Sequence, residues 1–359
     1  MPERNTMKKI QELQQVKGDA YDYYIAGNED TDLFEKIFLV DDIVEEICKP
    51  DKYFLIGEKG SGKTAYSVYM SKSDKINSFC SISLVENTLY QRFLNMKRQK
   101  ALELSSFKDV WINLIYLILA EKIRKEYGET FFSSIKYKQL SKAIDVFYSD
   151  AFKPEFVNAF EFVDNASASI NSMMKQGLFS TGTKASAETS QKYVEQSFQI
   201  SLLKIRDGFE KAFMSVNLKK PTILFVDGID ARPRDIDNEQ YFECLVGLVN
   251  AVLEMNQSFL KEKQIKIMLL IRPDIMYKMP VHNMNQKLRN NSVLLNWVTS
   301  YRKYIDSKLF KIADDYFMKQ QDYSYELGEC WNYYFPYKVE YQEKWKAPDN
   351  PFVEFLRLS

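Results

Sequence analysis

Short runs of largely apolar residues alternate along the chain with longer segments whose apolar positions repeat at helical spacing. The clearest runs cover 53–56, 223–226 and 265–271, and a weaker one covers 78–84. Runs of this length that contain β-branched residues are typical of parallel strands buried on both faces. The pattern therefore predicts strands of a parallel sheet, separated in the chain by helices.

The segments between these runs mostly carry helix signals. The most complete one begins at Ser106, a good N-cap residue, and ends at Gly128, with apolar side chains at helical spacing between them. The segment 166–191 is rich in Ser, Ala, Thr and Gly and has almost no periodic apolar signal. It predicts a mobile loop or lid. The other predicted helices cover 7–16, 40–48, 65–71, 137–148, 193–216 and 238–259.

Strands that alternate with helices predict an α/β fold, a three-layer parallel sheet that binds its ligand at the carboxyl edge of the strands. We expect an N-terminal helical arm over 1–30 and a main domain over 31–300, with a helical insertion over 105–215. A helical region over 301–359 would follow. Because the final segment 351–359 is apolar, we expect this region to be incomplete.

Composition narrows the classes of function. Lys plus Arg and Asp plus Glu are equal at 49 each, so no global positive field favours a nucleic acid. The single histidine, His282, and four cysteines without a CxxC pair argue against a zinc site and favour reduced thiols. The N-terminus is polar, and the apolar run 114–120 is far shorter than the ~20 residues of a membrane span. We therefore expect a cytoplasmic protein without a membrane partner.

The strand 53–56 runs directly into a segment that matches GxxxxGK[ST] at every fixed position. In such a loop the glycines let backbone N–H groups turn onto a phosphate, and the next helix adds its positive N-terminal end. Lys63 would reach the β- and γ-oxygens, and Thr64 would offer its hydroxyl to Mg²⁺. A chance match is the alternative. The predicted nucleotide contacts are Gly57, Glu58, Lys59, Gly60, Ser61, Gly62, Lys63, Thr64 and Ala65.

A second motif follows the strand 223–226. Asp227 stands at the carboxyl end of that strand, where it can hold Mg²⁺ beside the hydroxyl of the phosphate loop. Asp230 comes three residues later, and no Glu follows Asp227 directly. Asp230 can therefore orient or deprotonate the attacking water, or it can be a carboxylate that caps the turn.

The strand 265–271 ends at an arginine in the sequence Arg-Pro-Asp. Arg272 can sense the γ-phosphate while Asp274 fixes its orientation, or the two can form a purely structural ion pair. Arg232 and Arg234 are weaker candidates for the same role.

Aromatic residues are concentrated over 323–345, and basic residues over 289–311. Base stacking on a nucleic acid is one interpretation of the aromatic segment. A helical core is favoured, because no basic residues are interleaved at regular spacing. The basic stretch is most simply the solvated face of a helix.

Three segments together resemble a family of bacterial P-loop ATPases related to the KAP and STAND NTPases. They are Phe-Val-Asp-Gly-Ile-Asp (225–230), Leu-Leu-Ile-Arg-Pro-Asp-Ile (269–275) and Asn-Ser-Val-Leu-Leu-Asn-Trp (291–297). The resemblance implies an ASCE-type ATPase core with an extra sheet strand, ATP as the nucleotide, Arg272 as a sensor, and a role in signalling or phage defence. This chain departs from it in two ways: it has no membrane segment between the motifs, and Asn290 stands where an acidic residue is expected.

The sequence thus predicts a cytoplasmic, Mg²⁺-dependent ATPase in which Lys63, Asp227, Asp230 and Arg272 act on ATP. Hydrolysis would drive a change of shape or of assembly, with an unidentified protein partner or further copies of the chain. The alternatives are a nucleotide-dependent binding switch with little hydrolysis, and an ATPase that depends on nucleic acid. Neutral net charge counts against the last.

Overall fold

The computed structural model describes residues 12–16, 18–25, 28–85, 107–133, 137–150, 202–230, 238–279, 288–296, 305 and 307–336. The predicted loop over 166–191 lies outside these ranges, as do Arg232, Arg234 and His282. The predicted helix over 7–16 is wrong where it can be compared, because residues 12–16 are not helical.

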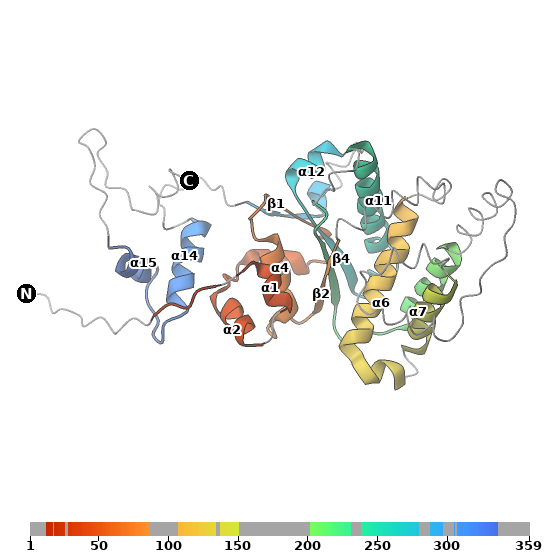
Figure 1. Ribbon diagram of the computed structural model, residues 1–359, viewed down its shortest axis with the longest axis horizontal. Coiled ribbons are helices and arrows are strands. Elements are labelled where there is room, and N and C mark those ends of the chain that lie inside the picture. The colour runs from red at the N-terminus through yellow and green to blue at the C-terminus, as the bar shows by residue number, and fades with distance from the viewer. Residues whose placement is uncertain are drawn as a thin grey trace, which may run out of the picture. The chain divides into compact units, whose positions relative to one another are not determined.

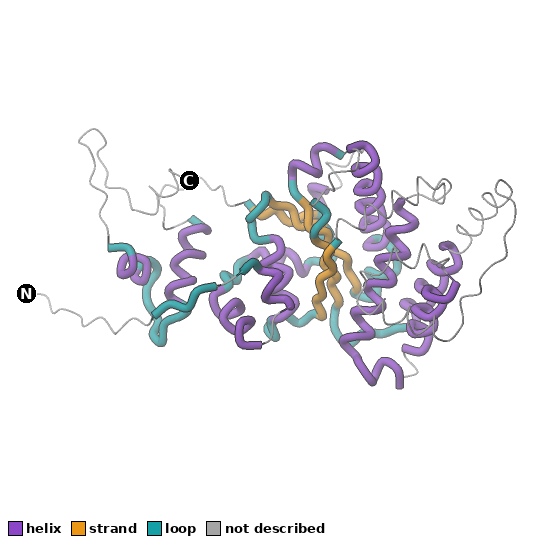
Figure 2. Tube along the Cα trace, viewed as in Figure 1, coloured by secondary structure: helices purple, strands orange, loops and turns teal. Residues whose placement is uncertain are grey.

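The described strands form one five-stranded parallel sheet in the order β2-β3-β4-β1-β5, so the α/β class is confirmed (Figure 2). β4 lies between β1 and β3, the two strands that precede the predicted nucleotide motifs. Since parallel strands point the same way, their carboxyl ends share one edge of the sheet. The strands are β1 (Phe54–Gly57), β2 (Phe79–Leu84), β3 (Thr222–Asp227), β4 (Ile265–Ile271) and β5 (Ser292–Leu295).

The central strands are buried along their whole length. Every residue of β3 and of β4 is buried, as expected for strands with a neighbour on each side. In register, Val226 of β3 and Phe54 of β1 both pair with Leu269 of β4. The amino end of β4 extends beyond β1, and there the side chain of Asn256 bonds both backbone groups of Ile267 at 2.8 Å. A side-chain amide thus takes the place of a strand partner.

β5 is a strand that apolar patterning did not reveal. It is short and lies at one end of the described sheet, next to β1, and its Leu294 is 63% exposed. Just before it, the carbonyl of Asn291 accepts hydrogen bonds from Tyr53 N–H at 2.7 Å and Phe54 N–H at 3.1 Å. An edge strand with one exposed side lacks the continuous apolar run by which the other strands were found.

The described residues group into two compact units. The larger one takes its residues from Ile47–Ile56 and Lys75–Val293, and the other from Met1–Glu46, Gly57–Asp74 and Leu294–Ser359.

In the larger unit, helix α6 (Phe107–Ser133) packs along α11 (Asn238–Asn256), as Figure 1 shows. The indole of Trp111 donates to the carbonyl of Cys244 at 3.0 Å across this contact. Gly247 allows the close approach, since a Cβ there would lie 2.6 Å from that of Phe107. α7 (Lys138–Asp150) packs on α6, residues 202–215 are also helical, and α12 (Pro273–Lys278) follows β4.

Most of the predicted helices of this unit are confirmed within a few residues. The stop predicted at Gly128 is visible as a break in α6, where that residue has φ 47° and ψ −126°, although helical structure continues to Ser133.

The second unit contains α1 (Ala20–Ile25), α2 (Asn28–Ile37) and α4 (Lys63–Lys72). Phe38 stacks on Tyr69 of α4 with ring centroids 4.3 Å apart. The hydroxyl of Tyr66 donates to Asp41 at 2.9 Å, and burial together with the charge of Asp41 raises the pKa of this phenol. α1 and α2 were not predicted as separate helices, because both are short and α2 is mostly polar. The helix predicted over 40–48 begins two residues later, as α3 (Asp42–Cys48).

The helices α14 (Lys308–Met318) and α15 (Glu329–Tyr334) contact each other around Trp331 and Phe310. Asp314 is fully buried and accepts hydrogen bonds from the backbone N–H of Gly328 at 2.7 Å and of Trp331 at 3.1 Å. The prediction of a helical core is thus confirmed around Trp331, whereas Tyr323 and Tyr333 of the same segment are exposed. In the basic stretch Arg289 and Lys311 are exposed, as predicted, and the half-buried Lys308 donates to Asp41 at 3.0 Å.

Candidate functional site

The predicted phosphate loop joins β1 to α4. Gly57 is the last residue of β1, and the helix starts at Lys63 with Gly62 as its N-cap. Gly60 and Gly62 have φ of 79° and 89°, in the left-handed region that glycine adopts without strain. α4 begins without a side-chain cap in the described part of the chain. A helix end of this kind is suited to an anionic oxygen as its acceptor.

The loop is also closely packed at its base. A Cβ on Gly57 would overlap the hydroxyl of Ser61 and lie 3.0 Å from the Cβ of Leu295. Ser61 itself is 3% exposed, and its N–H donates to the carbonyl of Glu58 at 3.1 Å. Glycine at 57 is therefore required by space, whereas the fixed Gly62 and the additional Gly60 are favoured by backbone conformation.

Lys63 folds back over its own loop. Its ammonium donates to the carbonyls of Gly57 at 2.7 Å and Glu58 at 3.0 Å. Thr64, the next residue, lies half-buried in the first turn of α4. Its carbonyl accepts from the hydroxyl of Ser67 at 2.8 Å. The loop therefore holds a cation and a hydroxyl on adjacent residues.

The second predicted motif lies at the carboxyl end of β3. Asp227 ends this strand and is 8% exposed. Its Oδ1 accepts from the N–H of Gly228 at 2.7 Å. Gly228 has φ 82°, and a Cβ there would lie 3.0 Å from the carbonyl oxygen of Val85. The hydroxyl of Tyr241 in α11 donates to the carbonyl of Ile229 at 2.6 Å and so fixes the turn that leaves the strand.

Arg272, at the carboxyl end of β4, forms a two-pronged ion pair with Asp274. Its Nε lies 3.0 Å from Oδ1, and its Nη2 lies 2.9 Å from Oδ2. On its other side, Nη1 is 3.9 Å from Oδ2 of Asp230. The bidentate geometry orients the guanidinium plane. The structure thus brings together Arg272, Asp230 and Asp274, three side chains predicted for the carboxyl edge.

Sequence reasoning did not single out Tyr241, which lies within the predicted helix 238–259. A tyrosine on an otherwise apolar helix face was the available signal, because a buried phenol needs a hydrogen-bond partner.

Within the described residues, no group of three or more His, Cys, Asp or Glu side chains is arranged to hold a metal ion. Mg²⁺ in a nucleotide site takes few protein ligands besides phosphate oxygens and water, so one hydroxyl and one carboxylate suit it.

No helix among the described residues has the length and hydrophobicity needed to cross a bilayer. No protein-family model, curated protein or solved structure matches this chain.

Proposed function

We propose that this protein is a Mg²⁺-dependent ATPase that uses ATP binding and slow hydrolysis to drive a change of shape or assembly. The observation that carries the proposal is the complete loop 57–64, which leaves a parallel strand and enters a helix through two left-handed glycines. The strand order supports it, because the strand that ends at Asp227 lies in the same sheet with a single strand, β4, between it and β1.

In this proposal the loop binds the phosphates of the nucleotide. The backbone amides from Gly57 to Ala65 and the start of α4 would contact the α- and β-phosphates. The Lys63 ammonium now donates to two backbone carbonyls, and it would exchange one or both of these for the β- and γ-oxygens. Adenine as the base rests on the family resemblance, since a phosphate loop does not read the base.

Thr64 and Asp227 would hold the magnesium ion, through a hydroxyl and a carboxylate. When bound, Mg²⁺ neutralises charge on the phosphate oxygens and so favours transfer of the γ-phosphoryl group. Asp227 is 8% exposed, and the N–H of Gly228 holds its Oδ1, so the carboxylate is fixed at the end of the strand where we assign it this role.

Asp230 and Arg272 are proposed to act on the water and on the γ-phosphate. Asp230 is exposed at the end of the turn, where it can orient or deprotonate the attacking water. Arg272 would stabilise the charge that develops on the phosphate oxygens. Because Asp274 holds the guanidinium at two points, Arg272 would contribute its remaining Nη1 side, which faces Asp230 at 3.9 Å.

A second candidate is a binding switch, in which ATP is held and barely hydrolysed. The ion pairs of Arg272 favour it, because both neighbouring carboxylates already partly neutralise that guanidinium. We also propose, from the family resemblance, a place in bacterial signalling or phage defence with a protein partner or a homo-oligomer. An arginine supplied by a neighbouring copy is compatible with such an assembly.

The test is phosphate release from Mg-ATP, with nucleotide binding measured separately on the same samples. The variants are Lys63→Ala, Asp227→Asn and Asp230→Asn, with Lys72→Ala at the far end of α4 as the matched control. We expect turnover in the wild type and Lys72→Ala, loss with Lys63→Ala or with EDTA, and no response to duplex DNA.

The outcomes separate the candidates. Tight ATP binding without turnover, unchanged in Asp230→Asn, would refute the ATPase and favour the switch. Turnover that rises with duplex DNA and falls steeply with salt would favour a nucleic-acid-dependent enzyme. Equal ATP binding by the wild type and Lys63→Ala would refute the assignment of the loop.

A further inference from the structure

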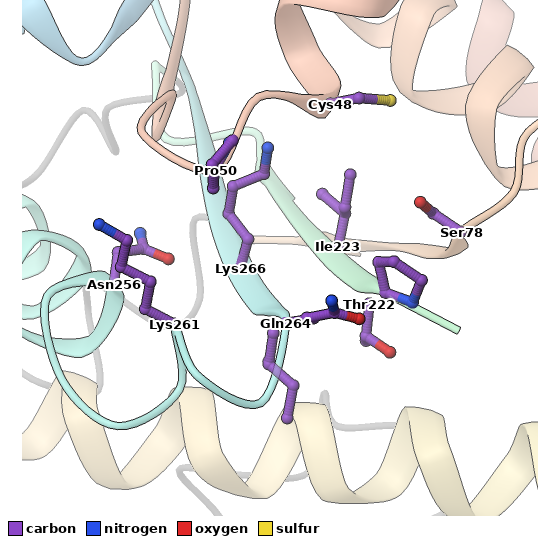
Figure 3. A pocket seen from close by; sticks show the side chains of 11 residues that line it. Cys48, Pro50, Ser78, Thr222, Ile223, Asn256, Lys261, Gln264 and Lys266 are labelled. Carbon is purple, nitrogen blue, oxygen red and sulfur yellow. The ribbon is translucent and has the colours of Figure 1, made fainter. Parts of the chain in front are cut away.

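A pocket of about 260 Å³ lies at the amino edge of the sheet, opposite to the strand ends that carry Asp227 and Arg272 (Figure 3). Its walls include Ile223, from the start of β3, and Lys266, from the start of β4. Drug-sized ligands occupy pockets of ~300–1,000 Å³, so this one suits a small molecule. None of its lining residues belongs to the nucleotide site proposed above.

Lys266 is a buried cation in the wall of this pocket. Only 7% of the residue is exposed, and its ammonium donates to the carbonyl of Ile47 and, at 2.7 Å, to that of Lys49. An ammonium has three N–H donors. Within the described residues two of them have an acceptor, which leaves the third for a ligand.

The surroundings of Lys266 solvate its charge poorly. Burial lowers the pKa of this ammonium to about 8, and Cys48, Cys80 and Asp51 oppose the shift only in part. Across the sheet, Lys266 is in register with Ile223, which is in turn in register with Cys80. At neutral pH the side chain is still mostly protonated. A cation held in such a place gains from an anion that comes close to it.

The lining is positively charged and otherwise mainly apolar. It includes two lysines, Lys261 and Lys266, and among the described lining residues there is no Asp or Glu. Pro50, Pro221 and Ile223 contribute apolar surface. A strongly hydrated ion such as inorganic phosphate would meet this surface at a cost, whereas a singly charged ligand with an apolar body matches both features.

We infer that this pocket binds a small organic carboxylate, with its carboxylate toward Lys266 and Lys261 and its apolar body against the prolines and Ile223. The inference is independent of ATP hydrolysis, because it concerns the opposite edge of the sheet.

The chain provides its own reporter for this pocket. Cys48 lines it and is exposed, whereas Cys80, Cys244 and Cys330 are buried. In the native, full-length protein a thiol reagent should therefore modify Cys48 first. Iodoacetate and iodoacetamide react alike: the thiolate attacks the CH₂ carbon, an S–C bond forms and iodide leaves. They differ chiefly in charge, so the ratio of their rates reports whether the pocket attracts a carboxylate.

The rates at Cys48 are measured by mass spectrometry at low ionic strength, in native protein and in the same protein unfolded in denaturant. We expect the iodoacetate-to-iodoacetamide ratio to be about tenfold higher in the native state, because a cleft lined by one sign of charge concentrates the opposite ion. Benzoate should slow the alkylation of Cys48 in the native protein, and neutral benzamide should not. A native ratio equal to or below the unfolded one, or equal protection by benzamide, would overturn the inference.

Variants assign the effect to the two lysines. Lys266→Met should abolish the native preference for iodoacetate, and Lys261→Met, at an exposed position, should reduce it severalfold. Lys263→Met is the matched control, since Lys263 lies outside the lining and donates to Asn217 at 3.1 Å. If Lys266→Met fails to fold, Lys261→Met decides: benzoate protection as strong as in the wild type would reject the proposal.

Discussion

Gly247 and Gly208 offer a matched pair of glycine-to-alanine changes with opposite expected signs. Both residues are helical. At Gly208 an added Cβ would meet no atom within 4 Å. At Gly247 it would lie 2.6 Å from the Cβ of Phe107 and 3.0 Å from the backbone nitrogen of Lys108. The two substitutions therefore share their effect on helix propensity and differ in packing.

The magnitudes can be compared. Replacing glycine by alanine inside a helix stabilises it by about 1 kcal/mol. Carbon atoms pack at about 3.5–4.0 Å, so the start of α6 must move by about 1 Å to admit a methyl group at position 247. Overpacking of this kind costs about 1–3 kcal/mol, and here the obstacle includes backbone, which yields less easily than a side chain end. We expect Gly247→Ala to destabilise the fold by about 1–2 kcal/mol net.

Urea denaturation, followed by far-UV circular dichroism and tryptophan fluorescence, measures both changes. Gly208→Ala should raise the free energy of unfolding by about 0.5–1 kcal/mol, with an unchanged slope against denaturant. Trp111 should report the shift in Gly247→Ala, because its indole bonds α11 at Cys244. If Gly247→Ala stabilises as much as Gly208→Ala does, the close contact between α6 and α11 is not as described.

Three further changes test other parts of the fold by the same denaturation assay. Gly228→Ala should cost about 1–2 kcal/mol, because φ is 82° and Val85 blocks the new methyl group; no loss would refute the left-handed turn. Asn256→Leu should lower the free energy of unfolding by about 1–3 kcal/mol, because it removes the side-chain hydrogen bonds to both backbone groups of Ile267. An unchanged stability would contradict these two hydrogen bonds. Lys266 has a pKa of about 8, below its usual 10.5, so the unfolded chain binds more protons between these values. Stability from this group should therefore rise by about 3 kcal/mol from pH 8 to pH 10.5. The thiol of Cys80, whose pKa is raised, contributes with the opposite sign. Subtracting the pH profile of Lys266→Met removes this contribution and leaves the rise due to Lys266. Equal pH profiles of the wild type and Lys266→Met would refute the prediction.

The sequence predicted what depends on local pattern. The strand 265–271 was found with both ends correct, because its residues are buried on both faces and largely apolar. The same pattern did not predict that Lys266 is buried, because its ammonium is held by carbonyls more than two hundred residues earlier in the chain. β5 was not predicted as a strand from its apolar pattern, because one of its sides is exposed.

For the candidate site, the loop motif predicted which residues form the turn, and the helix predicted over 65–71 begins two residues earlier, as α4. The sequence left two interpretations open for Arg272, and the Arg272–Asp274 ion pair, which is present, belongs to both of them. Its approach to Asp230 was not predicted, since it depends on how the turns after β3 and β4 face each other. Distances between side chains on different strands are set by tertiary packing, which no local pattern contains.

The strand order has a consequence for synthesis on the ribosome. β1 is made early, yet both its neighbours in the sheet come late: Phe54 pairs with Leu269 of β4, and β5 follows later still. At about 5–20 residues per second, the apolar segment of β1 must wait on the order of ten seconds or more for a partner. A nascent chain stalled before β4 would expose β1 on both edges, so we expect early release products to aggregate and to be recognised by chaperones.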